Sequence, residues 1–397
     1  MLYCLIDDLQ KGFIMLKKKL LAFDFILFFL TLCMIVIGLT AIGSANRINT
    51  MESGLSTELL NSEFFNQVIW SILGVLTMLV VSFIDYHFIC KFYVIIYIVN
   101  LILLVLVLAI GTEISNVKRW IFGIQPSEFS KIFMIIFLAS FIDKHKDSIN
   151  EFKTLFFLFI LVLIPVYLIN KQPSLSASLV LLAIFACQIF VGKINLKYIK
   201  IVFVIVMPIV VILGFDLMSE NQYILSTFLK EYQISRITSI IDFDLNTTDS
   251  SLYQTKHSVW AIGSGQLIGK GLFNGNMNQL NYIPYSYNDF IFAIIGEEFG
   301  FIGCFCVLMV ALLIILKCLL VANSSLDDLG MLIVVGVVGM LFFQIFVNTG
   351  VATSLLPNTG MPFPFLSAGG SSMLVNTTCI GLVINVGMAK PRNLFEN

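Results

Sequence analysis

Long apolar stretches, each close to the length that crosses a lipid bilayer, constrain this chain more than any other feature. The runs 88–110 and 201–215 carry few or no charges after their first residues, and about 20 apolar residues are needed to span a membrane as a helix. The chain is 58% hydrophobic and 12% charged, whereas a soluble domain carries roughly 25% charged residues. No soluble fold could bury so much apolar surface, so the sequence predicts an all-α integral membrane protein.

Hydropathy and helix-breaking residues together predict about ten transmembrane helices. The expected spans are 21–45, 64–85, 88–110, 127–143, 153–170, 174–192, 198–218, 287–317, 329–349 and 369–389. The transmembrane domain would then occupy 21–389, between a cytoplasmic segment at 1–20 and a cytoplasmic tail at 390–397. Met15 is a candidate true start, in which case residues 1–14 are an annotation artefact.

The basic residues predict the orientation, because lysine and arginine are retained in cytoplasmic loops. With the N-terminus inside, 14 of the 23 basic residues fall in cytoplasmic segments, 8 fall in outer segments and Lys131 falls within a helix. Both termini are then cytoplasmic. The longest connection, 219–287, lies outside, between helices seven and eight, and a loop of this length is usually functional or disordered.

A first cluster of polar residues near the predicted outer face runs from Asn116 to Lys131. Ionisable residues within membrane spans are costly and tend to mark function. Glu128 and Lys131, three residues apart, share one helical face and can pair. Two interpretations stay open. One is a buried ion pair that orients two helices. The other is a polar cavity for an anionic substrate, in which Arg119 and Lys131 supply positive charge and Trp120 an interfacial platform.

A second cluster, at 285–300, contains Asp289, Glu297 and Glu298. Asp289 is expected two residues into a helix that enters the membrane from outside, where the helix dipole stabilises a carboxylate. It could act only as a cap for this helix, or it could take part in catalysis. Glu297 and Glu298 lie about two turns deeper and need partners, and we interpret both as structural.

A third cluster, at 348–372, combines three prolines with repeated glycines. Irregular backbone at membrane depth is tolerated only where it lines a buried or watery cavity. A plain interhelical loop is the alternative interpretation. Nothing in these clusters supplies a Ser-His-Asp triad, because His257, the histidine predicted outside, has no nucleophile elbow to pair with.

The cysteines and histidines indicate no cofactor. The eight cysteines lie mostly in apolar runs without CxxC spacing, and the three histidines have no ligand-spaced neighbours. A divalent cation, Mg²⁺ or Mn²⁺, is compatible with this sequence but no ligand set indicates one. The glycines of 260–272 match neither a Walker A loop nor a Rossmann turn, so we expect neither a nucleotide nor a nucleic acid as a partner.

In these clusters the sequence resembles the SEDS family (shape, elongation, division and sporulation), whose members include RodA, FtsW and SpoVE. Four motifs in order, over nearly the whole chain, carry the resemblance. They are Arg119-Trp120 with Gln125-Pro126-Ser127-Glu128 and Lys131; residues 261–265 with Gly269-Lys270-Gly271; residues 289–293 with Gly296-Glu297-Glu298; and Leu356-Pro357, Thr359-Gly360, Pro364-Phe365 and Gly369-Gly370-Ser371-Ser372. The short tails and Ile84-Asp85-Tyr86 favour a RodA-like member slightly.

The resemblance implies a glycosyltransferase in the bacterial cytoplasmic membrane. It would polymerise lipid II into undecaprenyl-linked glycan at the outer face, for cell elongation, division or sporulation. The expected partner is a class B penicillin-binding protein, the transpeptidase that crosslinks the strands. Asp289 matches the essential aspartate of the family, and Arg119, Glu128 and Lys131 match conserved residues of its polar cavity.

The resemblance and the charge pattern together assign roles to the remaining motif residues. Substrate contacts are expected from Arg119, Trp120, Gln125, Ser127, Glu128, Lys131, Lys270 and Ser371, and structural roles from Glu297, Glu298, Pro357, Gly360, Gly369 and Gly370. Two stretches depart from the family pattern. The usual Pro-Glu-x-His-Thr-Asp is here 284–289, without the glutamate and the histidine, and the usual Gln-Pro-Asp-Leu-Gly-Thr is here 172–177, without the aspartate.

Our mechanistic hypothesis is that Asp289 is the general base on the acceptor hydroxyl, while Arg119, Lys131 or Lys270 offsets charge on the departing diphosphate. A flippase or transporter of lipid-linked precursors is one alternative, since polar clusters within helices also suit a substrate path. An inactive scaffold for a penicillin-binding protein is another, because a glutamate and a histidine are lost. The three clusters are predicted at one face of the membrane, which favours the enzyme over the transporter.

Overall fold

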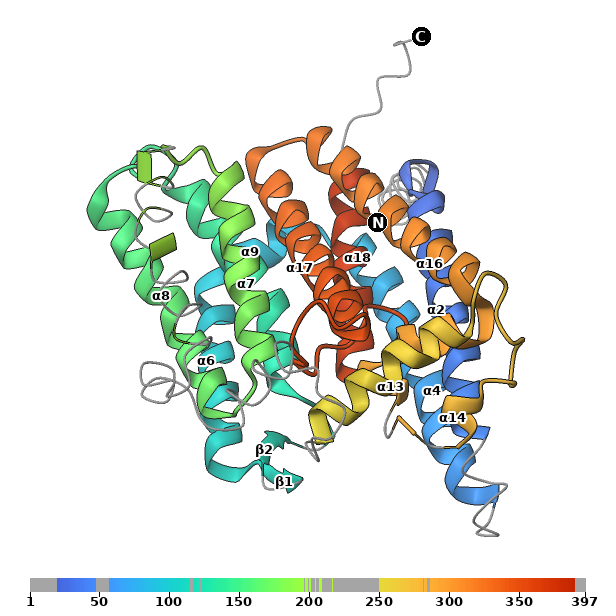
Figure 1. Ribbon diagram of the computed structural model, residues 1–397. Helices are drawn as coiled ribbons and strands as arrows, with labels where there is room; N and C mark the ends of the chain where they lie inside the picture. Colours follow the sequence, from blue (N-terminus) through green and yellow to red (C-terminus); the bar gives the residue numbers. More distant parts are fainter. Residues whose placement is uncertain are drawn as a thin grey trace.

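The structure is a bundle of long helices with irregular segments and short elements at one end (Figure 1). This computed structural model describes residues 20–47, 57–114, 117–121, 123–195, 197–198, 200, 204, 207–208, 216, 250–280, 282–283 and 286–389. The helices are α2 (Phe25–Arg47), α4 (Thr57–Phe83), α5 (Tyr86–Lys91), α6 (Tyr93–Ile110), α7 (Pro126–Lys144), α8 (Phe152–Lys171), α9 (Leu175–Val191), α13 (Ser250–Ser264), α14 (Asn276–Gln279), α15 (Ser286–Asp289), α16 (Ile291–Asn323), α17 (Asp328–Ala352) and α18 (Gly370–Met388).

Seven helices in the described part of the chain are long and apolar enough to cross a membrane: α2, α4, α6, α8, α16, α17 and α18. Large apolar side chains on α6 and α8, among them Ile102, Phe156 and Tyr167, are more than half exposed, as lipid-facing residues are in a protein without its membrane. The α17 and α18 helices are instead mostly buried. The prediction of an all-α integral membrane fold is confirmed.

Nine of the ten predicted spans coincide with helices of the structure, with shifted ends. The predicted span at 88–110 is divided at Phe92 into α5 and α6, and the span at 287–317 is divided at Phe290 into α15 and α16. The remaining span, at 198–218, lies almost wholly outside the described residues, so the count of ten stays a prediction. The part of the long loop that is described contains α13 and α14.

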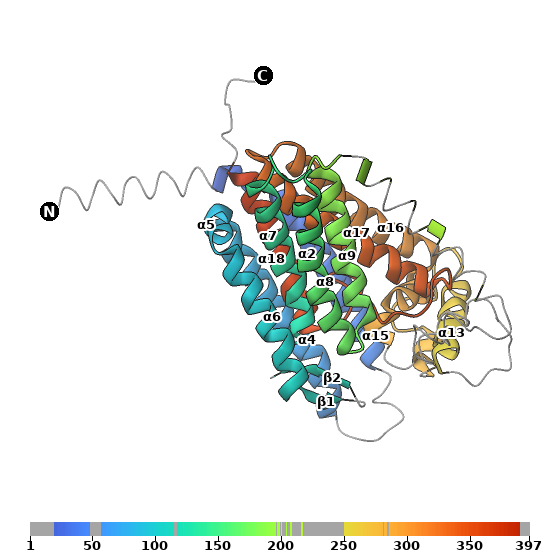
Figure 2. The same cartoon turned by 90° about the vertical axis from the view of Figure 1, so that its left-hand side faces the viewer.

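A short antiparallel hairpin, which the sequence did not predict, follows α6. It pairs β1 (Thr112–Ile114) with β2 (Val117–Trp120). The hairpin and α13 lie at one end of the bundle, whereas α5 and the turn between α16 and α17 lie at the opposite end (Figures 1 and 2). The polar clusters predicted at the outer face are therefore gathered at one end.

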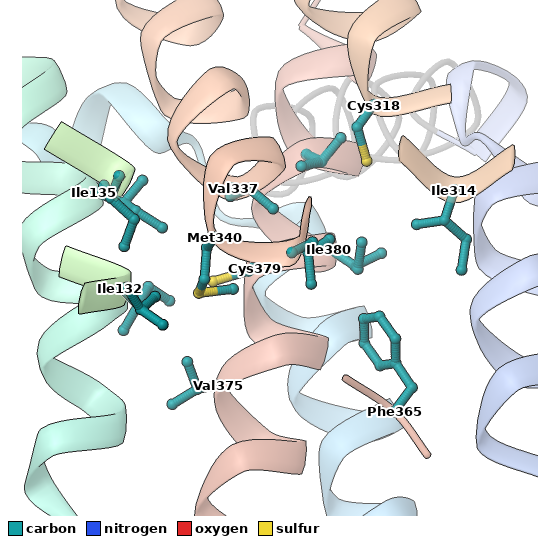
Figure 3. Close-up of a cluster of buried hydrophobic side chains, with 14 of the residues drawn as sticks. Ile132, Ile135, Ile314, Cys318, Val337, Met340, Phe365, Val375, Cys379 and Ile380 are labelled. Atoms are coloured by element: carbon teal, nitrogen blue, oxygen red, sulfur yellow. The ribbon is translucent and has the colours of Figure 1, made fainter. Parts of the chain in front are cut away.

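Small residues allow α4 and α18 to pack closely. A Cβ atom on Gly381 of α18 would lie 2.6 Å from the carbonyl oxygen of Met78 in α4, and one on Gly370 would overlap the ring of Trp70. Close approach through small residues is a common way for helices to associate in membranes, where the hydrophobic effect no longer drives packing. Beside this contact, Ile132 and Ile135 of α7 face Met340 of α17 and Cys379 of α18 (Figure 3).

We predict that Gly381→Val lowers the thermal unfolding midpoint, because the added side chain must separate α4 from α18. Overpacking of this kind typically costs about 1–3 kcal/mol. Gly263→Ala in α13 is the control, since a Cβ there meets nothing within 4 Å, and it should leave the midpoint unchanged or slightly raised. Equal unfolding midpoints for wild type and Gly381→Val in the same detergent would contradict the packing account.

A network at the end predicted to be cytoplasmic ties α5 to the start of α17. The imidazole of His87 lies 2.9 Å from Asp85 Oδ1 through Nδ1 and 2.8 Å from Asp327 Oδ2 through Nε2. Tyr86 donates its hydroxyl to Asp327 Oδ1 at 2.6 Å. Burial alone would lower the pKa of His87, but the hydrogen bonds to Asp85 and Asp327 outweigh it and raise this pKa above its usual 6.5. For Asp327 the directions are reversed. Burial alone would raise its pKa, but hydrogen bonds from Tyr86, the Gly330 amide and His87 outweigh burial and lower this pKa below its usual value.

We predict a pH-dependent contribution of His87 to stability. A histidine whose pKa is raised by folding stabilises the protein fully below its unfolded pKa, and this contribution is lost as pH rises through the folded pKa. The thermal unfolding midpoint of wild type should therefore fall more between about pH 6 and about pH 9 than the midpoint of His87→Gln does, because no group at this position titrates in the variant. Parallel pH profiles for the two proteins would contradict this role.

Candidate active site

A cavity of about 420 Å³ opens at the polar end of the bundle. Its size falls within the usual range for sites that hold small molecules. Its walls come from β2, the start of α7, the α8–α9 turn, the start of α9, α15, the α17–α18 connection and the start of α18. The lining residues are Arg119, Trp120, Gln125, Glu128, Lys131, residues 173–177, Val180, Asn288, Asp289, residues 357–362, Ala368, Gly369, Ser371 and Ser372.

The cavity brings together residues from all three predicted clusters. From the set expected to contact substrate, the structure places Arg119, Trp120, Gln125, Glu128, Lys131 and Ser371 in its wall, together with Asp289. Pro357, Gly360 and Gly369 of the structural set also line it. Ser127 is buried beside the cavity, 3.1 Å from Gln125 Nε2, and Gly370 packs on Trp70. The convergence of segments that are far apart in sequence makes this cavity the candidate active site.

The pair of Glu128 and Lys131 forms within the first turn and a half of α7. Lys131 Nζ lies 2.7 Å from Glu128 Oε1, and both side chains are more than nine-tenths buried. The second carboxylate oxygen, Glu128 Oε2, has no hydrogen-bond partner among the described residues. The two sequence interpretations are thus compatible, because the pair is both a buried ion pair and part of the cavity wall.

Arg119 holds the β-hairpin against the α8–α9 turn. Its Nε donates to the carbonyl of Gln172 at 3.0 Å, and its Nη2 donates to the carbonyl of Pro173. Gln172 in turn donates through Nε2 to the carbonyl of Leu104 at 3.0 Å. Arg119 therefore shapes the cavity wall as well as lining it. The serines at 174 and 176, within the stretch that departs from the family pattern, line the same wall.

Asp289 is the last residue of the short helix α15, and a single residue, Phe290, separates it from the start of α16. The N-cap position of α16 is Phe290, and no side chain there makes a capping hydrogen bond. The Asp289 side chain is part of the cavity wall. A Cβ atom on Gly360 would lie only 3.4 Å from Asp289 Oδ2, so the α17–α18 connection approaches this carboxylate closely. The prediction that Asp289 lies two residues into a continuous helix is therefore wrong, because the chain breaks at Phe290.

Asn348 was part of the third cluster but received no role from the sequence. It is fully buried in α17, and its side-chain amide donates to the backbone carbonyls of Asp289 and Met361. A polar residue near the end of an apolar helix is the only local signal, and it does not reveal these two distant partners. Four further residues also line the cavity: Asn288, Asn358, Thr359 and Ser372. The sequence feature that could have identified them is their position next to the motif residues.

Lys270 lies away from the cavity and pairs with Glu297. Its Nζ is 2.6 Å from Glu297 Oε1, which also accepts the Met277 amide at 2.9 Å. Glu298, also buried, accepts a hydrogen bond from Ser44 of α2. The two glutamates thus have the partners that we expected them to need. Because Lys270 is not among the lining residues and its ammonium group is engaged by Glu297, we leave it out of the proposed substrate contacts.

The loop at 265–271 lies directly on α16, where that helix is interrupted at Gly300 with φ of 66°. The backbone amides of Phe301 and Ile302 donate to the carbonyls of Gln266 and Leu267, at 2.9 and 3.1 Å. A Cβ atom on Gly269 would overlap the Glu298 carbonyl. The glycines of this motif therefore serve close backbone contact instead of phosphate binding.

We predict that Lys270→Met destabilises the protein by about 1–3 kcal/mol, because it leaves the Glu297 carboxylate buried without its ammonium partner. The double variant Lys270→Met/Glu297→Gln should recover part of this loss, which a double-mutant cycle of unfolding midpoints would measure. Additive effects would contradict the pairing. Loss of activity without loss of stability would indicate instead that Lys270 contacts the substrate.

Among the described residues, no group of three or more histidine, cysteine, aspartate or glutamate side chains is arranged to hold a metal ion. The cavity wall itself contributes two carboxylates, Glu128 and Asp289, from different elements.

Comparison with known proteins shows the family to which this chain belongs. The family model described as "Cell cycle protein" (FTSW_RODA_SPOVE) matches residues 24–391, nearly the whole chain. The chain belongs to the FtsW/RodA/SpoVE family. The SEDS resemblance inferred from the four motifs is therefore confirmed, and the chain is a multi-pass protein of the bacterial cytoplasmic membrane.

Curated relatives of this family match over almost their full length. A "Probable peptidoglycan glycosyltransferase FtsW" from Geobacter sp. (strain M18) is 29% identical over 379 residues, which cover 93% of this chain and 98% of the relative. "Stage V sporulation protein E" from Bacillus subtilis (strain 168) is 31% identical over 375 residues, which cover 91% and 96%. Relatives with both names match, so the slight preference for a RodA-like member stays a prediction.

Two solved structures share the fold of this FtsW/RodA/SpoVE chain. One, described as "Structural coordination of polymerization and crosslinking by a peptidoglycan synthase complex", has a TM-score of 0.74 and 24% identity, and covers 94% of this chain and 100% of that chain. The rod shape determining protein RodA of Thermus thermophilus has a TM-score of 0.65 and 23% identity, and covers 94% and 99%.

Proposed function

We propose that this chain is a peptidoglycan glycosyltransferase that polymerises lipid II into glycan strands at the outer face of the cytoplasmic membrane. The observation that carries the proposal is the placement of the Asp289 carboxylate, Arg119 and the buried Glu128–Lys131 pair around one cavity at the polar end of the bundle. Relatives whose names state this activity match over nine-tenths of the chain or more. They support the same reaction for this chain.

The proposed reaction joins two lipid-linked sugars. The oxygen of an acceptor sugar hydroxyl forms a bond to the anomeric carbon of the donor, and the bond from that carbon to the lipid diphosphate breaks. The hydroxyl proton passes to Asp289, which acts as the general base, and the diphosphate leaves with the bonding electrons. Proton transfer to a positioned carboxylate typically contributes about 10² to 10⁴ in rate.

Arg119 is a basic residue of the cavity wall suited to the departing diphosphate, because a guanidinium group can bind phosphate oxygens through two parallel N–H groups. The charge of Lys131, the other basic residue that lines the cavity, is offset by Glu128 at 2.7 Å. Ser371 adds a hydroxyl in the first turn of α18, where the helix dipole also favours an anion. Its Oγ accepts the Gln125 amide at 2.9 Å, which keeps the hydroxyl at the cavity wall.

We predict that Asp289→Asn lowers the rate of lipid II polymerisation by about 10² or more, because the amide cannot accept the proton. Folding and lipid II binding should persist, since the two side chains have the same shape. The measurement is glycan strand formation from labelled lipid II by protein reconstituted in vesicles. The control is Asp24→Asn at the far end of the bundle, where Asp24 lies 3.8 Å from Lys317. An Asp289→Asn protein that polymerised at nearly the wild-type rate would exclude Asp289 as the base.

The same reconstitution distinguishes the two alternatives. A flippase would move labelled lipid II between leaflets without forming polymer, and a scaffold would do neither. The described cavity lies at one end of the bundle instead of the membrane midplane, where transporters bind their substrates. This position favours the enzyme.

We further propose that the chain works with a crosslinking enzyme, a class B penicillin-binding protein. The support is the likeness to the subunit of a peptidoglycan synthase complex described as coordinating polymerisation with crosslinking. The polymerisation experiment is therefore run with and without a class B penicillin-binding protein.

A further inference from the structure

The side chain of Asn348 joins two segments of the cavity wall to α17. Its Nδ2 donates to the backbone carbonyl of Asp289 at 2.8 Å and to that of Met361 at 2.7 Å. Both partners are carbonyl oxygens, which only accept, so the two hydrogens of the Asn348 NH₂ group can serve them both. The residue is fully buried, and water therefore does not compete for these bonds.

The Asp289 carbonyl needs such a donor because the chain breaks beside it. In a continuous helix it would accept the amide of Ala293, four residues on. The Ala293 amide instead donates to the carbonyl of Phe290 at 2.9 Å. Asn348 supplies a donor from a neighbouring helix, and by doing so it holds the backbone of Asp289 at the point where α15 ends.

The second bond holds the segment that faces the Asp289 carboxylate. Met361 follows Gly360, which has φ of 67°. A Cβ atom added to Gly360 would lie 3.4 Å from Asp289 Oδ2. A backbone bond from Ala368 to the Tyr287 carbonyl, at 2.9 Å, ties the far end of the same connection to α15. One amide group therefore sets the separation between the backbone of Asp289 and the wall opposite its side chain.

The cost of Asn348 argues against a role in stability alone. Its Oδ1 is buried and has no hydrogen-bond partner among the described residues. An unpaired buried acceptor is costly, and this cost reduces the net gain from the two bonds. The tie between the two segments is what the residue provides that an apolar side chain could not.

We propose that Asn348 is a positioning residue for Asp289, which it holds at the angle and depth needed to accept the proton of the acceptor hydroxyl. This inference rests on the proposed function of Asp289 as the base. Without the amide, the carbonyls of Asp289 and Met361 both lose the donor that joins them to α17, and the carboxylate loses its alignment. A shift of about 1 Å in a reacting group can cost about 10²-fold in rate.

The first test compares the kinetics of Asn348→Leu, Asn348→Asp and Gln344→Leu in the lipid II polymerisation assay. Both Asn348 variants keep the approximate size of the side chain but lack the NH₂ group. Gln344 is the matched control, since it lies one turn deeper on α17, is fully buried and makes no side-chain hydrogen bond within the described part of the chain.

We expect kcat of the Asn348 variants to fall by about 10- to 100-fold with KM changed by less than about threefold, because positioning acts on the chemical step. Gln344→Leu should keep both values within about twofold of wild type. A raised KM with unchanged kcat would overturn the proposal, because Asn348 would then act on substrate binding. An equal fall in kcat for Gln344→Leu would also overturn it, because the effect would be one of packing in α17.

The second test reads the position of residue 289 without catalysis. In an Asp289→Cys background, a membrane-impermeant maleimide labels the thiol from outside, and the parent chain without Asp289→Cys gives the background from native cysteines. Adding Asn348→Leu or Asn348→Asp should change the labelling rate by about fivefold or more, whereas adding Gln344→Leu should not. Unfolding midpoints identify any variant that fails to fold, and the other Asn348 variant then decides.

The two tests separate the inference from the function on which it rests. An unchanged labelling rate in both Asn348 variants would overturn the positioning role even if the enzyme polymerises lipid II. A changed labelling rate in a chain whose wild type forms no polymer would support the positioning of residue 289 and reject the proposed function.

Discussion

Within a bilayer, every break in a helix exposes backbone groups that only the protein can satisfy, and the site of this FtsW/RodA/SpoVE protein is built around such breaks. At Phe290 the carbonyl of Asp289 accepts a hydrogen bond from the side chain of Asn348. At Gly300 the amides of Phe301 and Ile302 are taken by carbonyls of the 265–271 loop. Each break therefore requires a second segment to lie against it, and these obligatory contacts bring distant parts of the chain to one place.

The same requirement gives the cavity its chemistry. On a continuous helix, the packing of the whole helix would set the position of a carboxylate. Asp289 instead ends a short helix and lies in the cavity wall. Around it, Glu128 and Lys131 neutralise each other, and Arg119 is held by uncharged carbonyl groups. The proposed base, Asp289, is thus on α15, and the basic residue proposed for the diphosphate, Arg119, is on β2. Both elements line the same cavity.

The sequence predicted the parts of this arrangement that local patterns encode. Apolar runs located most of the helices, and the three-residue spacing of Glu128 and Lys131 predicted their pairing. The glycines and prolines of 357–370 predicted irregular backbone at a cavity. In each case the relevant residues lie within a few turns of each other, so their spacing carries the information.

What the sequence could not predict depends on contacts between distant segments. Glu297, the partner of Lys270, is 27 residues away in sequence. Lys270 was expected to contact substrate because the sequence shows its charge and not its partner. The carbonyl partners of Arg119 are more than 50 residues away. The break at Phe290 has no proline or glycine to mark it, and the residue that completes it, Asn348, lies 59 residues later in the chain.

The most direct measurement of the central claim is a structure of this protein with an acceptor and a lipid II analogue whose diphosphate cannot leave. The account predicts that the acceptor hydroxyl oxygen lies about 2.6–3.2 Å from a carboxylate oxygen of Asp289, directly or through one water. It also predicts that the diphosphate lies on the side of Arg119 and the first turn of α18. An acceptor hydroxyl bound elsewhere, with the Asp289 carboxylate in contact with neither sugar, would contradict it.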